Sequence, residues 1–230
     1  MKKAIYVTAR ELVRHSFREQ LKASAPQEVI LWSEEGGATG FAQFCREMMR
    51  DEHRAVLAEL RTMGIATASG GHVASALLPR GLFDVYPYWF RMDEQGVRVT
   101  DANFCASSRE AMAYISWRAG QLLAQLPSVG HRYYFLPDEP RDAVCHCPAC
   151  RHLSAAQQRM IYAEAVLEGL RAKDQAAEVA YPVYEEDECL PRDWRAGIFL
   201  IGTDSALRRH GARLLSVHPA EHMTATDSVM

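Results

Sequence analysis

Two adjacent carboxylates, Asp138 and Glu139, are the clearest candidates for chemistry in this sequence of 230 residues. They follow an apolar run at 133–136, and a proline stands on each side of the pair. Because successive side chains of a strand point to opposite faces, one carboxylate can face a reacting bond while the other orients a neighbour. Burial of Glu139 among apolar side chains would raise the pKa of its carboxyl, as a general acid requires. The alternative is that Asp138 only caps the segment that follows.

A glycine pair followed by a histidine, Gly70-Gly71-His72, is the second candidate. Two glycines let the backbone pass close to another group. The imidazole of His72 can then hydrogen-bond a substrate hydroxyl or a carboxylate. A structural histidine that only holds the loop fits the pattern equally well.

Acidic residues also follow aromatic residues at two other strand ends. Trp32 is followed by Glu34 and Glu35, and Tyr184 is followed by Glu185 and Glu186. Aromatic faces stack on pyranose rings and carboxylates bind hydroxyls, so these pairs are typical of a sugar site. Each pair alone also fits a solvated acidic loop, and only their convergence in space would make a site.

A cysteine cluster at 145–150 indicates a metal site. Cys145, Cys147 and Cys150 can reach one ion. The fourth ligand would be His146, His152 or a distant residue such as Asp142. A structural zinc site and a buried thiol-lined turn are both compatible with a single knuckle, because two separated CxxC pairs would be the stronger signal. The other candidate residues require no cofactor.

The composition is that of an ordinary soluble globular protein. Hydrophobic residues make up 48%, charged residues 24%, and the net charge is −3, which does not favour nucleic-acid binding. No run approaches the roughly 18 apolar residues of a membrane span. Charged residues at positions 10, 11 and 14 interrupt the amino end where a signal peptide needs an apolar core. We therefore expect a cytoplasmic protein with no membrane partner, unless an upstream secretion signal has been trimmed away.

Helices and strands alternate along the chain. Capping patterns and apolar spacing predict helices at 9–22, 41–63, 107–125 and 154–173. Short apolar runs predict strands at 4–7, 29–32, 65–68, 133–136, 179–184 and 198–201. Continuous apolar strands between amphipathic helices indicate a parallel sheet with right-handed crossovers.

Polar tips at the carboxyl ends of five strands favour a barrel over an open sheet, because the strand ends of a closed barrel converge. We predict an α/β fold, a parallel (β/α) TIM-like barrel left incomplete at five or six strands, within residues 1–205. Residues 206–230 are predicted to be a polar tail without strands. The long, aromatic connection at 70–106 is expected to be an ordered lid or wall over the carboxyl ends.

Three segments, IATASGGHVASALLP, YPYWFRMDEQGVRVTDANFCASS and RYYFLPDEPRDAVCHCPACRHLSAAQQ, together resemble the domain of unknown function 4838 family. This group looks related to the alpha-glucuronidase and family 20 beta-hexosaminidase barrels, and the similarity covers about 29–184. It implies an eight-stranded barrel and carbohydrate-active chemistry. In hexosaminidase-like relatives a glutamate at the position of Glu139 is the acid, and an aspartate at that of Asp138 orients the substrate's acetamido group. His72 looks like the histidine of a Pro-Gly-His turn in those enzymes, but Gly70 stands here in place of the proline. A second departure is that the predicted strands are too few to close an eight-stranded barrel.

The sequence therefore predicts a glycoside hydrolase-like protein that acts on an oligosaccharide or glycoside. The predicted catalytic residues are Glu139 and Asp138, and the predicted substrate-binding residues are His72, Trp32, Glu34, Asn103, Tyr184 and Glu185. The main alternative is a non-catalytic glycan- or partner-binding module with a structural cysteine knuckle. A third is metal-dependent hydrolysis centred on the cysteines. Exposed edges of a partial sheet would favour self-association.

Overall fold

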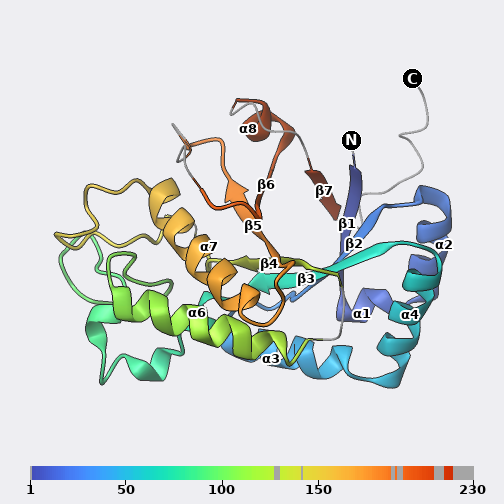
Figure 1. Ribbon diagram of the computed structural model, residues 1–230, viewed down its shortest axis with the longest axis horizontal. Helices are drawn as coiled ribbons and strands as arrows, with labels where there is room; N and C mark the ends of the chain where they lie inside the picture. Colours follow the sequence, from blue (N-terminus) through green and yellow to red (C-terminus); the bar gives the residue numbers. More distant parts are fainter. Residues whose placement is uncertain are drawn as a thin grey trace.

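A curled parallel sheet forms the centre of the computed structural model, which describes residues 2–126, 130–140, 142–187, 190, 194–209 and 215–219 (Figure 1). The strands are β1 (Lys2–Thr8), β2 (Glu28–Trp32), β3 (Ala66–His72), β4 (Arg132–Leu136), β5 (Glu178–Val183), β6 (Ile198–Gly202) and β7 (Leu215–Pro219). All pairs are parallel, in the order β6-β5-β4-β3-β2-β1-β7. The predicted incomplete parallel α/β barrel is confirmed.

Helices connect the strands and lie along the outside of the sheet (Figure 1). The α-helices are α1 (Ala9–Leu12), α2 (His15–Ser24), α3 (Gly37–Met48), α4 (Asp51–Thr62), α5 (Ala74–Leu77), α6 (Arg109–Leu123), α7 (Ala155–Arg171) and α8 (Asp204–Arg209). Thr8 and Ser154 each form the expected capping box, while α6 is capped by Ser108, one residue after the serine that the pattern suggested. No helix within the described ranges is long and apolar enough to cross a membrane.

Two helices that the sequence predicts as continuous are each divided. Segment 9–22 forms α1 and α2, which separate at Arg14, and segment 41–63 forms α3 and α4, which separate at Arg50. Both arginines have extended backbone, with ψ of 141° and 148°. The divided helices pack differently, since α3 contacts α5 whereas α4 contacts β3. Apolar spacing continues on both sides of each break, so spacing alone predicts one helix where there are two.

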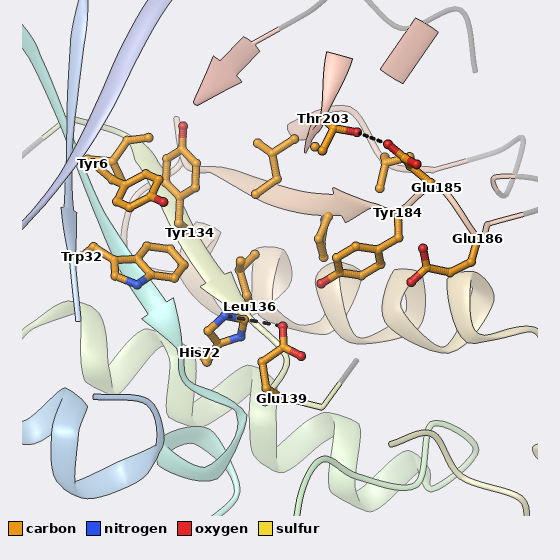
Figure 2. Close-up of a pocket in the computed structure, with 15 residues that line it drawn as sticks. Tyr6, Trp32, His72, Tyr134, Leu136, Glu139, Tyr184, Glu185, Glu186 and Thr203 are labelled. Carbon is orange, nitrogen blue, oxygen red and sulfur yellow. Dashed lines mark hydrogen bonds and ion pairs between the residues drawn. The ribbon is translucent and has the colours of Figure 1, made fainter. Parts of the chain in front are cut away.

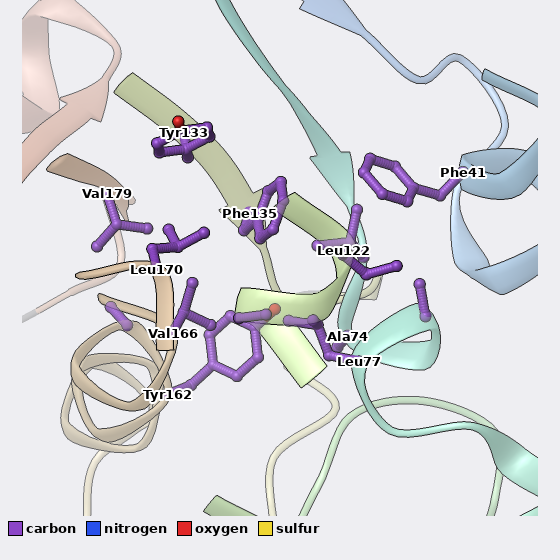
Figure 3. Close-up of a cluster of buried hydrophobic side chains, with 14 of the residues drawn as sticks. Phe41, Ala74, Leu77, Leu122, Tyr133, Phe135, Tyr162, Val166, Leu170 and Val179 are labelled. Atoms are coloured by element: carbon purple, nitrogen blue, oxygen red, sulfur yellow. The ribbon is translucent and has the colours of Figure 1, made fainter. Parts of the chain in front are cut away.

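Alternation of side chains along the strands separates two apolar cores. Side chains facing the inside of the curled sheet form a small cluster of Ala4, Ile30, Ala68, Tyr134, Leu136 and Ala180. Their chain neighbours, such as Ile5, Leu31 and Phe135, belong to the larger core between the sheet and the helices. Figure 3 shows Phe135 within this outer core, together with Leu122 of α6 and Val166 of α7. The apolar cluster on the inner face is therefore much smaller than the outer core and leaves room for a cavity.

The segment after residue 205 does not match the predicted tail. Residues 204–209 are helical, and Leu215–Pro219 forms β7, which pairs with β1. The prediction of no further strands is therefore wrong for these residues, and the described part of the chain forms a sheet of seven strands rather than five or six. The two edge strands, β6 and β7, come near each other without forming a ladder among the described residues. Self-association through these edges stays a prediction.

The connection at 70–106 is ordered, as its apolar content predicts. It contains α5 and two short 3₁₀ helices, Arg80–Leu82 and Pro87–Trp89. Leu77 and Phe90 are fully buried. Beyond β3 this connection packs on α3, α6 and the cysteine-bearing loop, and it does not line the large pocket described below. The segment is thus an outer wall of the fold rather than a lid on the pocket.

Candidate functional site

A pocket of about 540 Å³ opens inside the curled sheet at the carboxyl ends of the strands (Figure 2). Its lining consists of Tyr6, Ile30, Trp32, His72, Tyr134, Leu136, Glu139, Pro182, Val183, Tyr184, Glu185, Glu186, Ile201, Gly202 and Thr203. These residues come from β1 to β6 and from the turns that follow β4, β5 and β6. Three carboxylates and several aromatic rings therefore share one cavity, at the edge where parallel α/β proteins build their sites.

The two-residue period of the strands brings the aromatic side chains to the pocket. Tyr6 is in register with Ile30, and Trp32 with Gly70, so these positions share the inner face. The ring of Trp32 lies 5.6 Å from that of His72 in an edge-on arrangement. His72 lies within β3, which extends four residues beyond the predicted strand, so its direction is set by the sheet rather than by a loop.

Gly70 is required by the close approach of β3 and β4. A Cβ atom at this position would lie 2.1 Å from the backbone oxygen of Tyr134. Gly70 thus serves strand packing, and because it is the register partner of Trp32 on β3, that position carries no side chain next to Trp32.

Glu139 faces the pocket beside His72 (Figure 2). The Nδ1–H of His72 donates to the carbonyl oxygen of Pro137 at 2.6 Å. Because a carbonyl only accepts, this bond fixes the proton on Nδ1 and turns Nε2 toward Glu139, whose Oε1 lies 3.9 Å away. The side chain of Glu139 is 50% exposed, so substrate can reach its carboxyl. The condition that the sequence analysis set for a raised pKa, burial of Glu139 among apolar side chains, is not met.

Asp138 points away from the pocket, although it adjoins Glu139 in the chain. Its Oδ2 accepts hydrogen bonds from Arg80 Nη2 at 2.8 Å and from the backbone N–H of Ser75 at 2.9 Å. The Asp138 side chain is only 12% exposed and is not part of the pocket lining. The two carboxylates therefore diverge, and Asp138 anchors the turn to the segment after β3.

Glu185 and Tyr184 lie at the end of β5, across the pocket from His72 (Figure 2). Hydrogen bonds from Ser205 and Thr203 lower the pKa of the Glu185 carboxyl, because they favour its ionised form. The backbone N–H of Tyr184 donates to Asp187 at 3.0 Å. This bond ties the backbone at the end of β5 to the turn that follows it.

Two predicted substrate-binding residues lie outside this pocket. Glu34 is exposed and lines a separate cavity of about 80 Å³ next to α3. Asn103 is only 6% exposed, and its amide hydrogen-bonds the backbone of Asp138 and Ala143. Neither side chain faces the residues that converge on Glu139.

Tyr6, Tyr134 and Thr203 line the pocket but were not among the predicted site residues. The signal for the two tyrosines was available, because both occupy inward positions of the two-residue period. The hydroxyl of Tyr134 donates to Glu28, which also pairs with Arg132 at 2.9 Å. This buried network forms a polar floor on the inner face of the sheet, away from the pocket mouth.

Four buried cysteines form a second constellation, here called the thiol cluster: Cys105, Cys145, Cys147 and Cys150. Their sulfur atoms all lie within 4.8 Å of one another. Cys105 Sγ is 3.7 Å from Cys147 Sγ and 3.8 Å from Cys150 Sγ. These separations are far too long for disulfides, whose S–S bond is about 2.05 Å. They match the spacing of about 3.8 Å between two sulfurs that each lie 2.3 Å from one tetrahedral zinc ion.

The surroundings of the thiol cluster also suit thiolates. Backbone N–H groups of Met92 and Ser107 donate to Cys145 Sγ and Cys150 Sγ, each at 3.3 Å. Arg98 Nη1 also donates to Cys145 Sγ at 3.7 Å, which places a positive charge beside the sulfurs. The fourth sulfur thus comes from a distant residue, Cys105 of the connection at 70–106, and not from His146, His152 or Asp142, which the sequence analysis named. Cys189 lies outside the described residues.

No protein-family model matches the chain, and no curated protein is similar to it in sequence. The resemblance to the domain of unknown function 4838 family therefore stays an expectation. Solved structures do share the fold. The pneumococcal virulence factor StrH, in a study of N-glycan recognition and hydrolysis, matches with a TM-score of 0.59 and 11% identity over 93% of this chain and 64% of that one.

Two further structures support the same fold. One is of the tandem GH20 catalytic modules of StrH, a pneumococcal exo-beta-D-N-acetylglucosaminidase, with a TM-score of 0.56 and 14% identity over 93% of this chain and 64% of that one. The other is a beta-galactosidase from the psychrophilic Marinomonas ef1, with a TM-score of 0.53 and 12% identity over 79% and 37%. The chain spans less than two thirds of these proteins. At such identities the likeness shows a glycoside hydrolase-like fold.

Proposed function

We propose that the pocket binds a glycoside or oligosaccharide and hydrolyses its glycosidic bond, with Glu139 as the general acid. The observation that carries this proposal is the convergence of Glu139, Glu185 and Glu186 with Trp32 and Tyr184 around one cavity. Carboxylates at opposite sides of a sugar ring and aromatic faces that stack on it are what such a reaction requires. The glycoside hydrolase-like fold supports the same conclusion.

In the proposed reaction Glu139 donates a proton to the leaving-group oxygen as the bond between that oxygen and the anomeric carbon breaks. A water molecule then adds to the anomeric carbon, and the proton that it loses restores the acid form of Glu139. His72 is held by Pro137 in the orientation that turns its Nε2 to Glu139, and it positions the acid. Glu185 is the wrong group for proton donation, because its hydrogen bonds favour the ionised form. It instead accepts hydrogen bonds from sugar hydroxyls, while Trp32 and Tyr184 stack on the ring.

Asp138 takes a positioning role in this proposal rather than contact with a substrate acetamido group. Its carboxylate is held by Arg80 and Ser75 on the far side of the turn. A group so placed fixes the backbone that leads into Glu139.

The decisive experiment compares Glu139→Gln with Glu34→Gln on a panel of aryl glycosides and N-acetylhexosaminides. Loss of a general acid costs about 10²- to 10⁴-fold in rate, so hydrolysis by the first variant should fall by that factor while glycan binding persists. Glu34 is an exposed glutamate outside the pocket, and its variant should behave as the wild type. Undiminished hydrolysis by Glu139→Gln would refute the assignment.

A non-catalytic glycan-binding module is the second candidate function. It is favoured by the missing ladder between β6 and β7 in the described residues, which leaves one side of the sheet unpaired. In the same experiment this module would bind members of the glycan panel, hydrolyse none of them, and show no difference in turnover between the two variants.

We further propose that the thiol cluster holds one structural Zn²⁺. Four protein thiolates complete a tetrahedral shell and leave no open position for substrate, which argues for a structural ion rather than for metal-dependent hydrolysis. Elemental analysis should find about one zinc per chain. Cys105→Ser should lower that content, whereas Cys45→Ser, at a buried cysteine outside the cluster, should not.

A further inference from the structure

We infer that Asn103 and the thiol cluster form one clamp, which sets the position of the turn that carries Glu139. This inference rests on the proposed roles of Glu139 and of the zinc ion. It assigns to Asn103 a positioning role in place of the substrate contact that the sequence predicts.

The Asn103 side chain is fully committed to the acidic turn. Its Oδ1 accepts the backbone N–H of Asp138 at 2.9 Å, and its Nδ2 donates to the carbonyl oxygens of Asp138 at 3.2 Å and Ala143 at 2.9 Å. Asn103 also adopts a left-handed backbone with φ of 52°, which few residues other than glycine, asparagine and aspartate accept. The amide is thus aimed at one turn by an unusual local conformation.

The segment that carries Asn103 is tied to the thiol cluster two residues later. Cys105 supplies one sulfur of the cluster, and its backbone N–H donates to the carbonyl of Trp89 at 2.8 Å. On the opposite segment, Ala143 accepts from Asn103, and Cys145 supplies a second sulfur. Segments 103–105 and 143–145 are therefore joined twice, by an amide at one end and by sulfurs at the other.

Arg80 adds a third connection between the same parts. Its Nη1 donates to the backbone carbonyl of Asn103 and its Nη2 donates to Asp138 Oδ2, both at 2.8 Å. The arginine is therefore shared by the clamp and the turn.

The clamp matters for Glu139, the proposed acid, because its side chain is half exposed. Few contacts hold the carboxyl of Glu139 directly, so its placement depends on the backbone before it. The peptide carbonyl of Asp138, which precedes the Glu139 nitrogen, is bound by the Asn103 amide. Release of the clamp would let this peptide move, and an acid displaced by about 1 Å loses rate without losing substrate binding.

The test uses Asn103→Gly, because glycine accepts the left-handed backbone at this position while the three amide hydrogen bonds are lost. The control is Asp101→Asn, which changes an exposed side chain on the same segment. Zinc-loaded wild type, chelator-stripped wild type and both loaded variants are compared. The measurements are zinc content, hydrogen exchange of the Asp138 amide, and kcat and KM for a cleaved glycoside.

We expect Asn103→Gly to retain zinc and to exchange the Asp138 amide about fivefold faster or more, as loss of one hydrogen bond implies. Its kcat should fall about tenfold with little change in KM. Stripped wild type should show the same faster exchange, and Asp101→Asn should match loaded wild type. Unchanged exchange at Asp138 in either Asn103→Gly or the stripped protein overturns the clamp. So does a rise in KM at constant kcat. Exchange requires no turnover, so it tests the clamp even if Glu139 proves not to be the acid.

Discussion

The pocket and the thiol cluster occupy neighbouring parts of the molecule and are built in opposite ways. The pocket is open, its lining comes from six strands and the turns that follow three of them, and Glu139 is half exposed. The thiol cluster is closed, since all four cysteines are buried and their sulfurs face one another. The pocket presents its polar groups to a ligand that enters from solvent. The thiol cluster has room only for an ion enclosed by the four sulfurs. The first arrangement suits binding and chemistry, and the second suits stability.

Asn103 and Arg80 connect these two regions through the turn at 137–140. The comparison therefore predicts a division of effects. Changes in the pocket should alter binding or turnover with little effect on the free energy of unfolding. Changes in the thiol cluster should lower the free energy of unfolding, and they should affect turnover only by releasing the clamp on the turn that carries Glu139.

The largest expected effect is on thermal stability after zinc removal. Because metal binding contributes to folding free energy, Cys105→Ser should destabilise the protein by about 3 kcal/mol, a fall in Tm of about 10 °C for a chain of this size. Calorimetry of the zinc-loaded wild type and of the variant measures the fall. Cys45→Ser, although buried, should cost less because it leaves the cluster intact. Equal losses from the two variants would contradict the proposed division.

The next largest effect is expected from loss of the ion pair between Arg80 and Asp138. Arg80→Met leaves the largely buried carboxylate of Asp138 without its charged partner, so unfolding free energy should fall by about 2 kcal/mol. Denaturant unfolding measures this loss. Arg18→Met removes a partly exposed arginine paired with Glu59 and should cost about 0.5 kcal/mol. A smaller loss for Arg80 than for Arg18 would mean that the turn is anchored elsewhere.

A smaller effect is expected on glycan affinity. Trp32→Ala removes an aromatic face from the pocket, and loss of about 60 Å² of apolar contact corresponds to roughly tenfold weaker binding. Titration calorimetry with a bound glycan measures the change. Trp117→Ala, at an exposed tryptophan of α6, is the matched control and should leave affinity unchanged. Unaltered affinity in Trp32→Ala would remove the ring from the proposed site.

The smallest effect is on the titration of one carboxyl. Ser205→Ala removes a hydrogen bond to the ionised form of Glu185, so the pKa of Glu185 should rise toward its ordinary value. In the wild type this lowered pKa favours the native state above the unfolded-state pKa, and that contribution disappears as pH falls through the native pKa. Carboxyl chemical shifts followed against pH measure the change. A pKa that stays in place would show that Ser205 does not hold Glu185.

Many of the pocket residues can be predicted from the local sequence pattern. Trp32, His72, Glu139, Tyr184 and Glu185 all lie at strand ends, and strand ends can be predicted from short apolar runs. Parallel strands place those ends at one edge, so convergence needed no knowledge of distant contacts. Glu34 also follows a strand, but the turn after β2 directs it to a different cavity. Local pattern placed Glu34 near the edge and could not give the direction of its side chain.

Distant pairings were not predictable in the same way. Cys105 joins cysteines more than 40 residues away, and Asn103 reaches Asp138 across 35 residues. Neither contact has a local spacing, because loop packing brings the partners together. Similarly, β7 was missed because a short edge strand becomes recognisable only through its pairing with β1.

The sequence by itself determined the alternation of strands and helices, the polar character of the strand ends and the three-cysteine knuckle, since each depends on residues within a few positions of one another. Only the tertiary structure decided that Glu139 faces the pocket while Asp138 turns away, that a fourth sulfur completes the thiol cluster, and that the sheet has a seventh strand. Side-chain periodicity is a local property of the backbone. The partner of a buried polar or sulfur group is set by which distant segments pack together, and the folded chain alone specifies that packing.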